Sequence, residues 1–295
     1  MTVRIACVAC LEPLVSVHTP TFLNAIGLAR DILLDDRAEL LYFNDRASAE
    51  HTLSVAREIV QAAPDVVVGH FASACAAAAA ETYRAVGIPL ILPAATKTSL
   101  TEGGGVFRLC DNDADYCAWL AERLPVPVRQ IETDGSAHGL SIRDKLTPLI
   151  CSTWRGESTV LFSGMYHNAI DFAVRTRART VILTDDADGP SLAQDLLSMG
   201  FQPEHKRVLV AALRPRPQGE GAARISYKLE KLSGVAPGTY FWETVASLQV
   251  ATEMGGRDWT NFEVDTVLGP VRFDQRGEYR PQQFCLYDVF KGRGA

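Results

Sequence analysis

The sequence predicts an α/β protein in which parallel sheets are covered by helices on both faces. Apolar runs rich in β-branched residues alternate with amphipathic segments along the 295-residue chain, a pattern typical of repeated βα units. The polar segment 111–115 interrupts this alternation, and a second series of βα units follows it. We therefore expect two similar lobes, each with its own sheet.

In the first half, each expected strand is a short apolar run, and each expected helix carries apolar residues three or four positions apart. Pro20 begins the first helix, with Thr19 or Thr21 available to cap it. The triplet 103–105 is all glycine and turns the chain into the last strand. The expected strands are 3–9, 39–44, 65–69, 88–92 and 106–109, and the expected helices are 20–34, 47–62 and 73–86.

The second half repeats the pattern and then returns to strands near the C-terminus. Arginine, proline and glycine over 214–221 predict a loop, and Gly269-Pro270 predicts a turn between two strands. The expected helices are 116–124, 140–149, 168–176, 222–232 and 244–254. The expected strands are 128–133, 159–163, 180–184, 264–268, 271–273 and 284–290.

Composition excludes several classes of partner. The net charge is −6 and arginine and lysine are scattered, which argues against a nucleic-acid or anionic-membrane surface. No apolar run approaches the roughly 18 residues of a membrane span.

The N-terminus enters a β-like run at once, without the pattern of a signal peptide. We expect a cytoplasmic protein as the sequence stands, or a periplasmic one if this is a trimmed form.

The seven cysteines predict reduced, buried thiols rather than disulfides, since their number is odd and most lie in apolar segments. Cys7 and Cys10 have the spacing of a redox pair. Residues three apart in a strand point to opposite faces, so their sulfur atoms should diverge. We predict no cofactor.

Two buried runs end next to small hydroxyl residues where helices are expected to begin. One run, 66–69, is followed by Ser73, and the other, 91–92, is followed by Thr96. Amide and hydroxyl groups at the carboxyl ends of parallel strands form anion sites, so this pattern favours a carboxylate ligand. Simple helix capping by Ser73 and Thr96 is the alternative.

Four segments carry a resemblance to a known family. They are Val68-Gly69-His70-Phe71-Ala72-Ser73, Pro93-Ala94-Ala95-Thr96, Phe107-Arg108 and the stretch 265–277, DTVLGPVRFDQRG. Together they resemble the type I periplasmic binding proteins, in particular the leucine/isoleucine/valine-binding branch. The resemblance implies two Rossmann-like lobes, joined by three crossing strands, that close on a ligand like a flytrap. Lobe one would hold 1–115 and 236–270, and lobe two 116–235 and 271–295.

The resemblance also implies roles for residues at matching positions. In lobe one, Ser73, the backbone around Ala94 and Ala95, and Thr96 would hold the ligand carboxylate. In lobe two, Asp185 would pair with the ligand ammonium, ahead of Asp186, and Tyr166 would form an aromatic wall. The alternative for Asp185 and Asp186 is a solvated strand-end loop.

Histidines depart from the family pattern. His18 and His138 fall near family aromatic positions, so the site should be more polar and suited to an amino-acid-like or amide-like ligand; the alternative for each is a surface loop residue. For His70 we expect a satisfied structural histidine, and for Lys97 a side chain that points to water. The acidic residues from 185 to 195 do not match a calcium loop, so we predict no metal.

Three functions are compatible with these expectations. The favoured one is non-catalytic binding of a small solute by a cytosolic sensor, with a regulatory protein or a second copy as partner. The first alternative is the substrate-binding component of an amino-acid ABC uptake system, with a permease as partner. The second is an enzyme that uses the cleft for biosynthetic chemistry, although no nucleophile elbow, phosphate loop or nicotinamide motif supports it.

Overall fold

The structure is a computed structural model, and it describes residues 2–124, 128, 130–150, 159–234, 236–255, 259, 262–280 and 284–291. The chain forms two compact units: unit one is Met1–Asn112 with Pro215–Pro281, and unit two is Asp113–Arg214 with Gln282–Ala295. The chain therefore passes between the units three times. The sequence placed 215–235 and 271–281 in lobe two, whereas the structure groups them with unit one.

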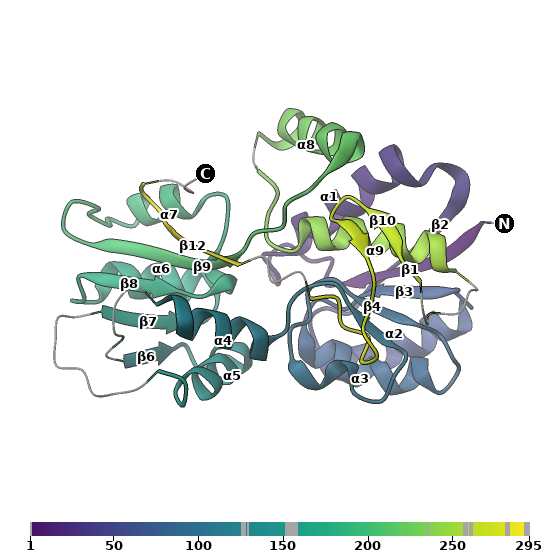
Figure 1. The fold of residues 1–295 in the computed structure, drawn as a ribbon, viewed down its shortest axis with the longest axis horizontal. Coiled ribbons are helices and arrows are strands. Elements are labelled where there is room, and N and C mark those ends of the chain that lie inside the picture. The colour runs from purple at the N-terminus through teal and green to yellow at the C-terminus, as the bar shows by residue number, and fades with distance from the viewer. Residues whose placement is uncertain are drawn as a thin grey trace. The chain divides into compact units, whose positions relative to one another are not determined.

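Unit one is built on a five-stranded sheet in the order β2-β1-β3-β4-β5 (Figure 1). All four pairings are parallel, which agrees with the predicted α/β class. The strands are β1 (Val3–Ala9), β2 (Ala38–Asn44), β3 (Val66–Gly69), β4 (Leu90–Leu92) and β5 (Val106–Arg108).

Helices cover both faces of this sheet. Successive side chains of a strand point to opposite sides, so each strand presents side chains to the helices on both faces. Ile5 and Cys7 of β1 pack in one buried cluster, and Ala6 and Val8 pack in the other. The first face is covered by α1 (Thr19–Ala29), α8 (Gly219–Ser233) and α9 (Phe241–Met254), and the second by α2 (Ala49–Gln61) and α3 (Ser73–Arg84).

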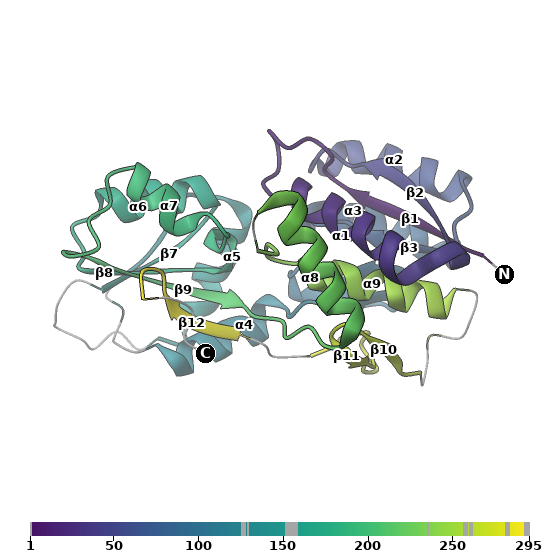
Figure 2. The ribbon, with the colours of Figure 1, turned by 90° about the horizontal axis from the view of Figure 1, so that it is seen from above.

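Helix α8 belongs to unit one because its apolar face packs in the same cluster as α1 and α9 (Figure 2). Ala222, Ile225 and Leu229, spaced three or four residues apart, are its buried residues. Contact unit one therefore resumes at Pro215, whereas the expected lobe boundary is at 236. Short elements complete the unit: η1 (Arg30–Leu34), η2 (Asp35–Arg37), η3 (Thr98–Thr101), β10 (Val264–Thr266) and β11 (Gly269–Val271).

Unit two has a five-stranded sheet in the order β12-β9-β8-β7-β6. Three pairings are parallel, and β12, the yellow strand of Figure 1, runs antiparallel to β9. Its strands are β6 (Gln130–Thr133), β7 (Thr159–Ser163), β8 (Thr180–Leu183), β9 (Arg207–Leu213) and β12 (Phe284–Asp288). Its helices are α4 (Asp113–Arg123), α5 (Ala137–Leu146), α6 (Tyr166–Arg175), η4 (Asp185–Ala187) and α7 (Leu192–Ser198).

Several local predictions were wrong. Strand β9 and helix α7 were not predicted from the sequence. The late turn was expected at Gly269-Pro270, whereas β11 begins at Gly269 and the turn precedes it. Neither Thr19 nor Thr21 caps α1: its N-cap is His18, and the Thr19 hydroxyl donates to the Cys10 carbonyl at 2.7 Å.

The six cysteines in the described ranges are free thiols, and Cys151 lies outside those ranges. Burial raises the pKa of the Cys7 thiol, which keeps it in its unreactive neutral form. Part of the expected strand 128–133, at Arg129, also lies outside the described ranges. Among the helices that the structure describes, none combines the length and apolar character needed to cross a membrane.

Candidate functional site

In unit one, the predicted carboxylate-binding residues lie together where β3 and β4 end. Ser73 is the first residue of α3, and its hydroxyl oxygen accepts a hydrogen bond from the Lys97 backbone N–H at 3.2 Å. Ala94, Ala95 and Thr96 are buried in the segment that leads to Lys97. Ser73 is thus tied to the 94–97 loop, while the Lys97 side chain is exposed, as expected.

Arg108, at the end of β5, binds the backbone of this loop. Its side chain is fully buried and donates to the carbonyl oxygens of Ala95 at 3.2 Å, Lys97 at 2.9 Å and Thr98 at 3.3 Å. Three carbonyls bound by one guanidinium fix the path of the backbone, because the five donors of arginine have a rigid planar geometry. In the sequence, Arg108 stands out only as part of a motif, and this role was not predicted.

Glu278 balances the charge of Arg108. Its carboxylate lies 3.1 Å from the Arg108 guanidinium and accepts the Thr101 hydroxyl hydrogen bond at 2.7 Å. The preceding residue, Gly277, has φ +79° and would place a Cβ only 2.3 Å from the Val106 carbonyl oxygen, so only glycine fits there. The 265–277 motif therefore ends where its chain must approach β5 closely.

His18 is the N-cap residue of α1 and is partly exposed. Its ring centroid lies 6.1 Å from that of Phe71 and 5.8 Å from that of Tyr240, both within the range of aromatic contacts. The structure therefore places His18 in an aromatic group. Sequence reasoning did not select Phe71 and Tyr240 as site residues, because Tyr240 is distant in sequence and Phe71 lies within a motif chosen for its serine.

His70 is a structural histidine, as expected. Its Nδ1 lies 2.8 Å from the Asp45 carboxylate, its Nε2 lies 3.1 Å from the Tyr83 hydroxyl, and its side chain is completely buried. Both ring nitrogens are thus satisfied.

In unit two, the three predicted site residues follow neighbouring strands: His138 follows β6, Tyr166 follows β7 and Asp185 follows β8. The carboxyl ends of parallel strands share one edge of the sheet, where ligands of open α/β sheets bind. Asp134 organises this edge, since its carboxylate accepts from the Met165 backbone N–H at 2.8 Å and from the Asn168 amide at 2.9 Å. Although burial opposes ionisation, these bonds and those from Ser136 hold its pKa down at about 2.

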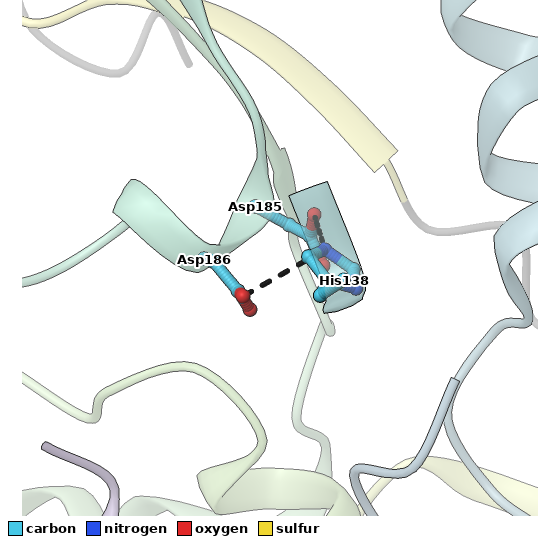
Figure 3. Close-up of side chains that lie close together, drawn as sticks. All are labelled: His138, Asp185 and Asp186. Atoms are coloured by element: carbon cyan, nitrogen blue, oxygen red, sulfur yellow. Dashed lines mark ion pairs between the residues drawn. The ribbon is translucent and has the colours of Figure 1, made fainter. Parts of the chain in front are cut away.

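His138 points between the carboxylates of Asp185 and Asp186 (Figure 3). Its Nε2 lies 3.5 Å from Oδ1 of Asp185 and 3.7 Å from Oδ2 of Asp186. Burial lowers the pKa of His138, but Asp186, Asp185 and Asp113 outweigh it and raise the pKa to about 10. The Asp185 carboxylate, predicted to face a ligand ammonium, therefore already lies beside an imidazole.

We expect NMR titration to find the His138 imidazole protonated up to pH 8. In Asp186→Asn, which removes a neighbouring negative charge and keeps the side-chain size, the His138 pKa should fall. An imidazole that titrates near pH 6.5 in the unmodified protein would contradict the ion-pair arrangement of Figure 3.

Tyr166, predicted as an aromatic wall, uses its hydroxyl to bind another residue. The hydroxyl donates to Oδ2 of Asp195 on α7 at 2.6 Å, and burial with this bond raises the pKa of Tyr166. Gly189 leaves room for the ring, since a Cβ there would lie 2.8 Å from Cε2 of Tyr166. Tyr116 is a further contact that sequence reasoning missed: its hydroxyl accepts from the Asp185 backbone N–H at 3.2 Å and donates to the Ala211 carbonyl at 2.8 Å.

No family model matches the sequence. Among curated proteins, the Leu/Ile/Val-binding protein of Escherichia coli K12 is 22% identical over 293 residues, covering 86% of this chain and 80% of that protein. The Leu/Ile/Val/Thr-binding protein of Salmonella typhimurium is 21% identical over 297 residues, with the same coverage of 86% and 80%.

Solved structures agree with this similarity. The branched-chain amino acid transporter substrate-binding protein of Streptococcus pneumoniae, in complex with isoleucine, has a TM-score of 0.77 at 16% identity, covering 95% of this chain and 94% of that chain. A solute-binding protein of an ABC transporter from Rhodopseudomonas palustris, in complex with p-hydroxybenzoic acid, has a TM-score of 0.72 at 12% identity, covering 98% and 92%. The chain therefore has the type I periplasmic-binding-protein fold, and the predicted resemblance to the leucine/isoleucine/valine-binding branch is confirmed.

Proposed function

We propose that this chain is the substrate-binding component of an ABC uptake system and takes a small amino-acid-like carboxylate. The observation that carries this proposal is the similarity to Leu/Ile/Val-binding proteins along 86% of the chain. It favours uptake, the first alternative of the sequence analysis, over a cytosolic sensor. Uptake of the labelled ligand by cells that lack this gene, with and without the gene restored, tests the transport role.

The local chemistry of unit one suits a carboxylate. Ser73 begins a twelve-residue helix, where backbone N–H groups lack acceptors within the helix and a hydroxyl lies beside them. The 94–97 loop is held by buried Arg108, so its backbone groups are already in place before a ligand binds. We assign the ligand carboxylate to Ser73, the backbone at Ala94 and Ala95, and Thr96.

Two candidate ligand classes differ in the group that they carry at the end opposite the carboxylate. Asp185 with Asp186 offers net negative charge beside His138, which suits an ammonium group. An aromatic acid without an amine is the second candidate, because His18, Phe71 and Tyr240 form an aromatic group in unit one and a structural neighbour holds p-hydroxybenzoic acid.

Calorimetric titration with leucine, isoleucine, valine, glutamine and p-hydroxybenzoate separates these candidates. Native mass spectrometry of the purified protein should first identify any ligand that co-purifies. Binding of an α-amino acid supports the main proposal, and binding of p-hydroxybenzoate alone replaces it with the second candidate. Absence of binding of all five compounds would contradict both candidates.

We expect Ser73→Ala to weaken binding of the carboxylate ligand by about 1–3 kcal/mol, because a buried ligand oxygen loses its hydrogen bond. The measurement is the dissociation constant by calorimetry. Ser54→Ala is the matched control, since Ser54 is an exposed serine on α2 of the same unit. Equal affinities of Ser73→Ala and the unmodified protein would remove Ser73 from the site.

We expect Asp185→Asn to weaken ligands that carry a free amine more than their amine-free analogues, because the variant loses a negative charge and little volume. Leucine and its 2-hydroxy analogue form a suitable pair for calorimetry. If both ligands lose the same affinity, Asp185 acts on the fold of unit two rather than on the amine.

A further inference from the structure

His138, Asp185 and Asp186 present three metal-ligating atoms to one point in unit two (Figure 3). One imidazole nitrogen and one oxygen from each carboxylate all lie within 4.8 Å of one another. Imidazole and carboxylate are the ligand types of zinc and of neighbouring divalent transition metals.

The distances are unlike those of hydrogen bonds. Nε2 of His138 lies 3.5 Å and 3.7 Å from the two carboxylate oxygens, beyond the 2.7–3.2 Å range of N–H···O bonds. Ligands that share a tetrahedral zinc ion at 2.0–2.2 Å are about 3.3–3.6 Å apart, so the nitrogen–oxygen separations are close to those of a zinc site. The three ligand atoms lie within 4.8 Å of one another, so small side-chain movements would bring them onto one ion. Among the described residues, this buried ring nitrogen has no hydrogen-bond partner.

The three side chains project from positions fixed by packing. His138 is the second residue of α5, whose N-cap Ser136 accepts the Gly139 backbone N–H at 3.2 Å. Asp185 and Asp186 begin η4, directly after buried β8, and the Asp185 backbone N–H is bound by the Tyr116 hydroxyl. The protonated His138 ring offsets part of the repulsion between these two carboxylates. A divalent cation would take over that role, and its binding would release the imidazole proton, because a metal binds the neutral ring.

From this geometry we propose that His138, Asp185 and Asp186 bind one divalent transition-metal ion of the zinc type. Three protein ligands leave a fourth tetrahedral position open to water or to a donor atom of a solute. Mg²⁺ and Ca²⁺ are excluded as the preferred ions, because they take oxygen ligands and the central ligand here is a nitrogen. This inference does not rest on the proposed uptake function, but it uses the carboxylates proposed there for a ligand ammonium, so a metal ion and an ammonium group would compete for Asp185 and Asp186.

The test uses zinc chloride with the full chain after chelator treatment and dialysis. Calorimetry should show one zinc per chain, and elemental analysis after gel filtration should recover the same ratio. Mg²⁺ should give no comparable heat. Cobalt(II) should add visible absorption bands of a tetrahedral site, a readout that does not depend on any solute.

His138→Gln should weaken zinc binding by about 100-fold or more, and Asp186→Asn by at least about tenfold. His205→Gln is the matched control: His205 is an exposed histidine of unit two, and its replacement should leave zinc affinity unchanged. Circular dichroism of each zinc-free variant establishes that the fold is retained, and Asp186→Asn gives a second route if His138→Gln does not fold.

Absence of stoichiometric zinc binding, or the same affinity in His138→Gln as in the unmodified protein, would overturn the proposal. So would loss of the site in His205→Gln. Leucine titration of the zinc-free protein is a separate measurement, so failure of the metal site and failure of the proposed uptake function give different results.

Discussion

Replacing Arg108 with methionine is expected to lower the free energy of unfolding by about 3–5 kcal/mol, because a buried ion pair is broken with one charge left behind. The guanidinium is fully buried, and the side chain of Glu278 is 3% exposed. Methionine keeps most of the apolar volume, so the loss reports on charge and hydrogen bonding. In this variant Glu278 stays buried. Of the two contacts described above for its carboxylate, only the hydrogen bond from the Thr101 hydroxyl remains.

Urea denaturation measures the loss, and Arg84→Met is the matched control. Arg84 also donates to two backbone carbonyls, at Gly104 and Glu102, and pairs with Glu81, but its side chain is 31% exposed. Exposed pairs contribute about 0–1 kcal/mol, so this control should lose little stability. Equal losses of unfolding free energy in the two variants would show that burial does not determine how much Arg108 contributes to stability.

A second variant tests whether Arg108 and Glu278 act as a unit. Removing both charges, in Arg108→Met with Glu278→Gln, should cost less than the sum of the single losses, because no uncompensated charge then remains buried. Simple additivity would contradict the pairing of Arg108 with Glu278.

Much of the fold could be predicted because buried residues recur at regular spacing along its strands and helices. Residues of β1 alternate between two cores, and the helices that cover them carry apolar residues at helical spacing, so local sequence contains the signal. Strand β9 also carries an apolar run, over 208–213, yet it was missed because α7 before it spans only Leu192–Ser198 and gives a short helical pattern. The contact unit one resumes at Pro215 rather than at the expected residue 236, because α8 packs on α1, nearly 200 residues away in sequence.

The candidate site was predictable only where it follows strand ends. Ser73 and the 94–97 loop are each adjacent to a buried run, so their meeting follows from the parallel sheet. Arg108 pairs with Glu278, and Asp185 pairs with His138. The separation of the partners along the sequence does not correspond to the period of a helix or a strand in either pair. Such contacts depend on how distant elements pack, which composition and periodicity do not contain.

Glu243 gives the second large effect, and it is a dependence of stability on pH. This carboxyl group, the third residue of α9, is 4% exposed. Burial raises its pKa from an ordinary value of 4.5 to about 7; its own backbone N–H opposes the shift, and the Asp111 carboxylate adds to it. Glu243 was not predicted as a buried group, because a glutamate at the start of a helix is usually exposed.

The sign of the effect follows from proton binding. Between pH 4.5 and about 7, the folded state holds a proton that the unfolded state has released, so the free energy of unfolding falls as pH rises. Below pH 4.5 both states are protonated, and above pH 7 both are ionised. The total loss across this window is about 3 kcal/mol, since one pKa unit corresponds to about 1.4 kcal/mol.

Glu243→Gln should isolate this contribution, because glutamine has nearly the same shape and does not titrate. The stability of the variant relative to the unmodified protein should increase by about 3 kcal/mol between pH 4 and pH 8, measured by urea denaturation at several pH values. Glu253→Gln is the control on the same helix: its carboxylate is half-exposed and pairs with Arg37, so its removal should change stability little at any pH. The difference in unfolding free energy between Glu243→Gln and the unmodified protein could instead stay constant with pH. Glu243 would then not hold its proton in the folded state, and burial alone would not set its charge.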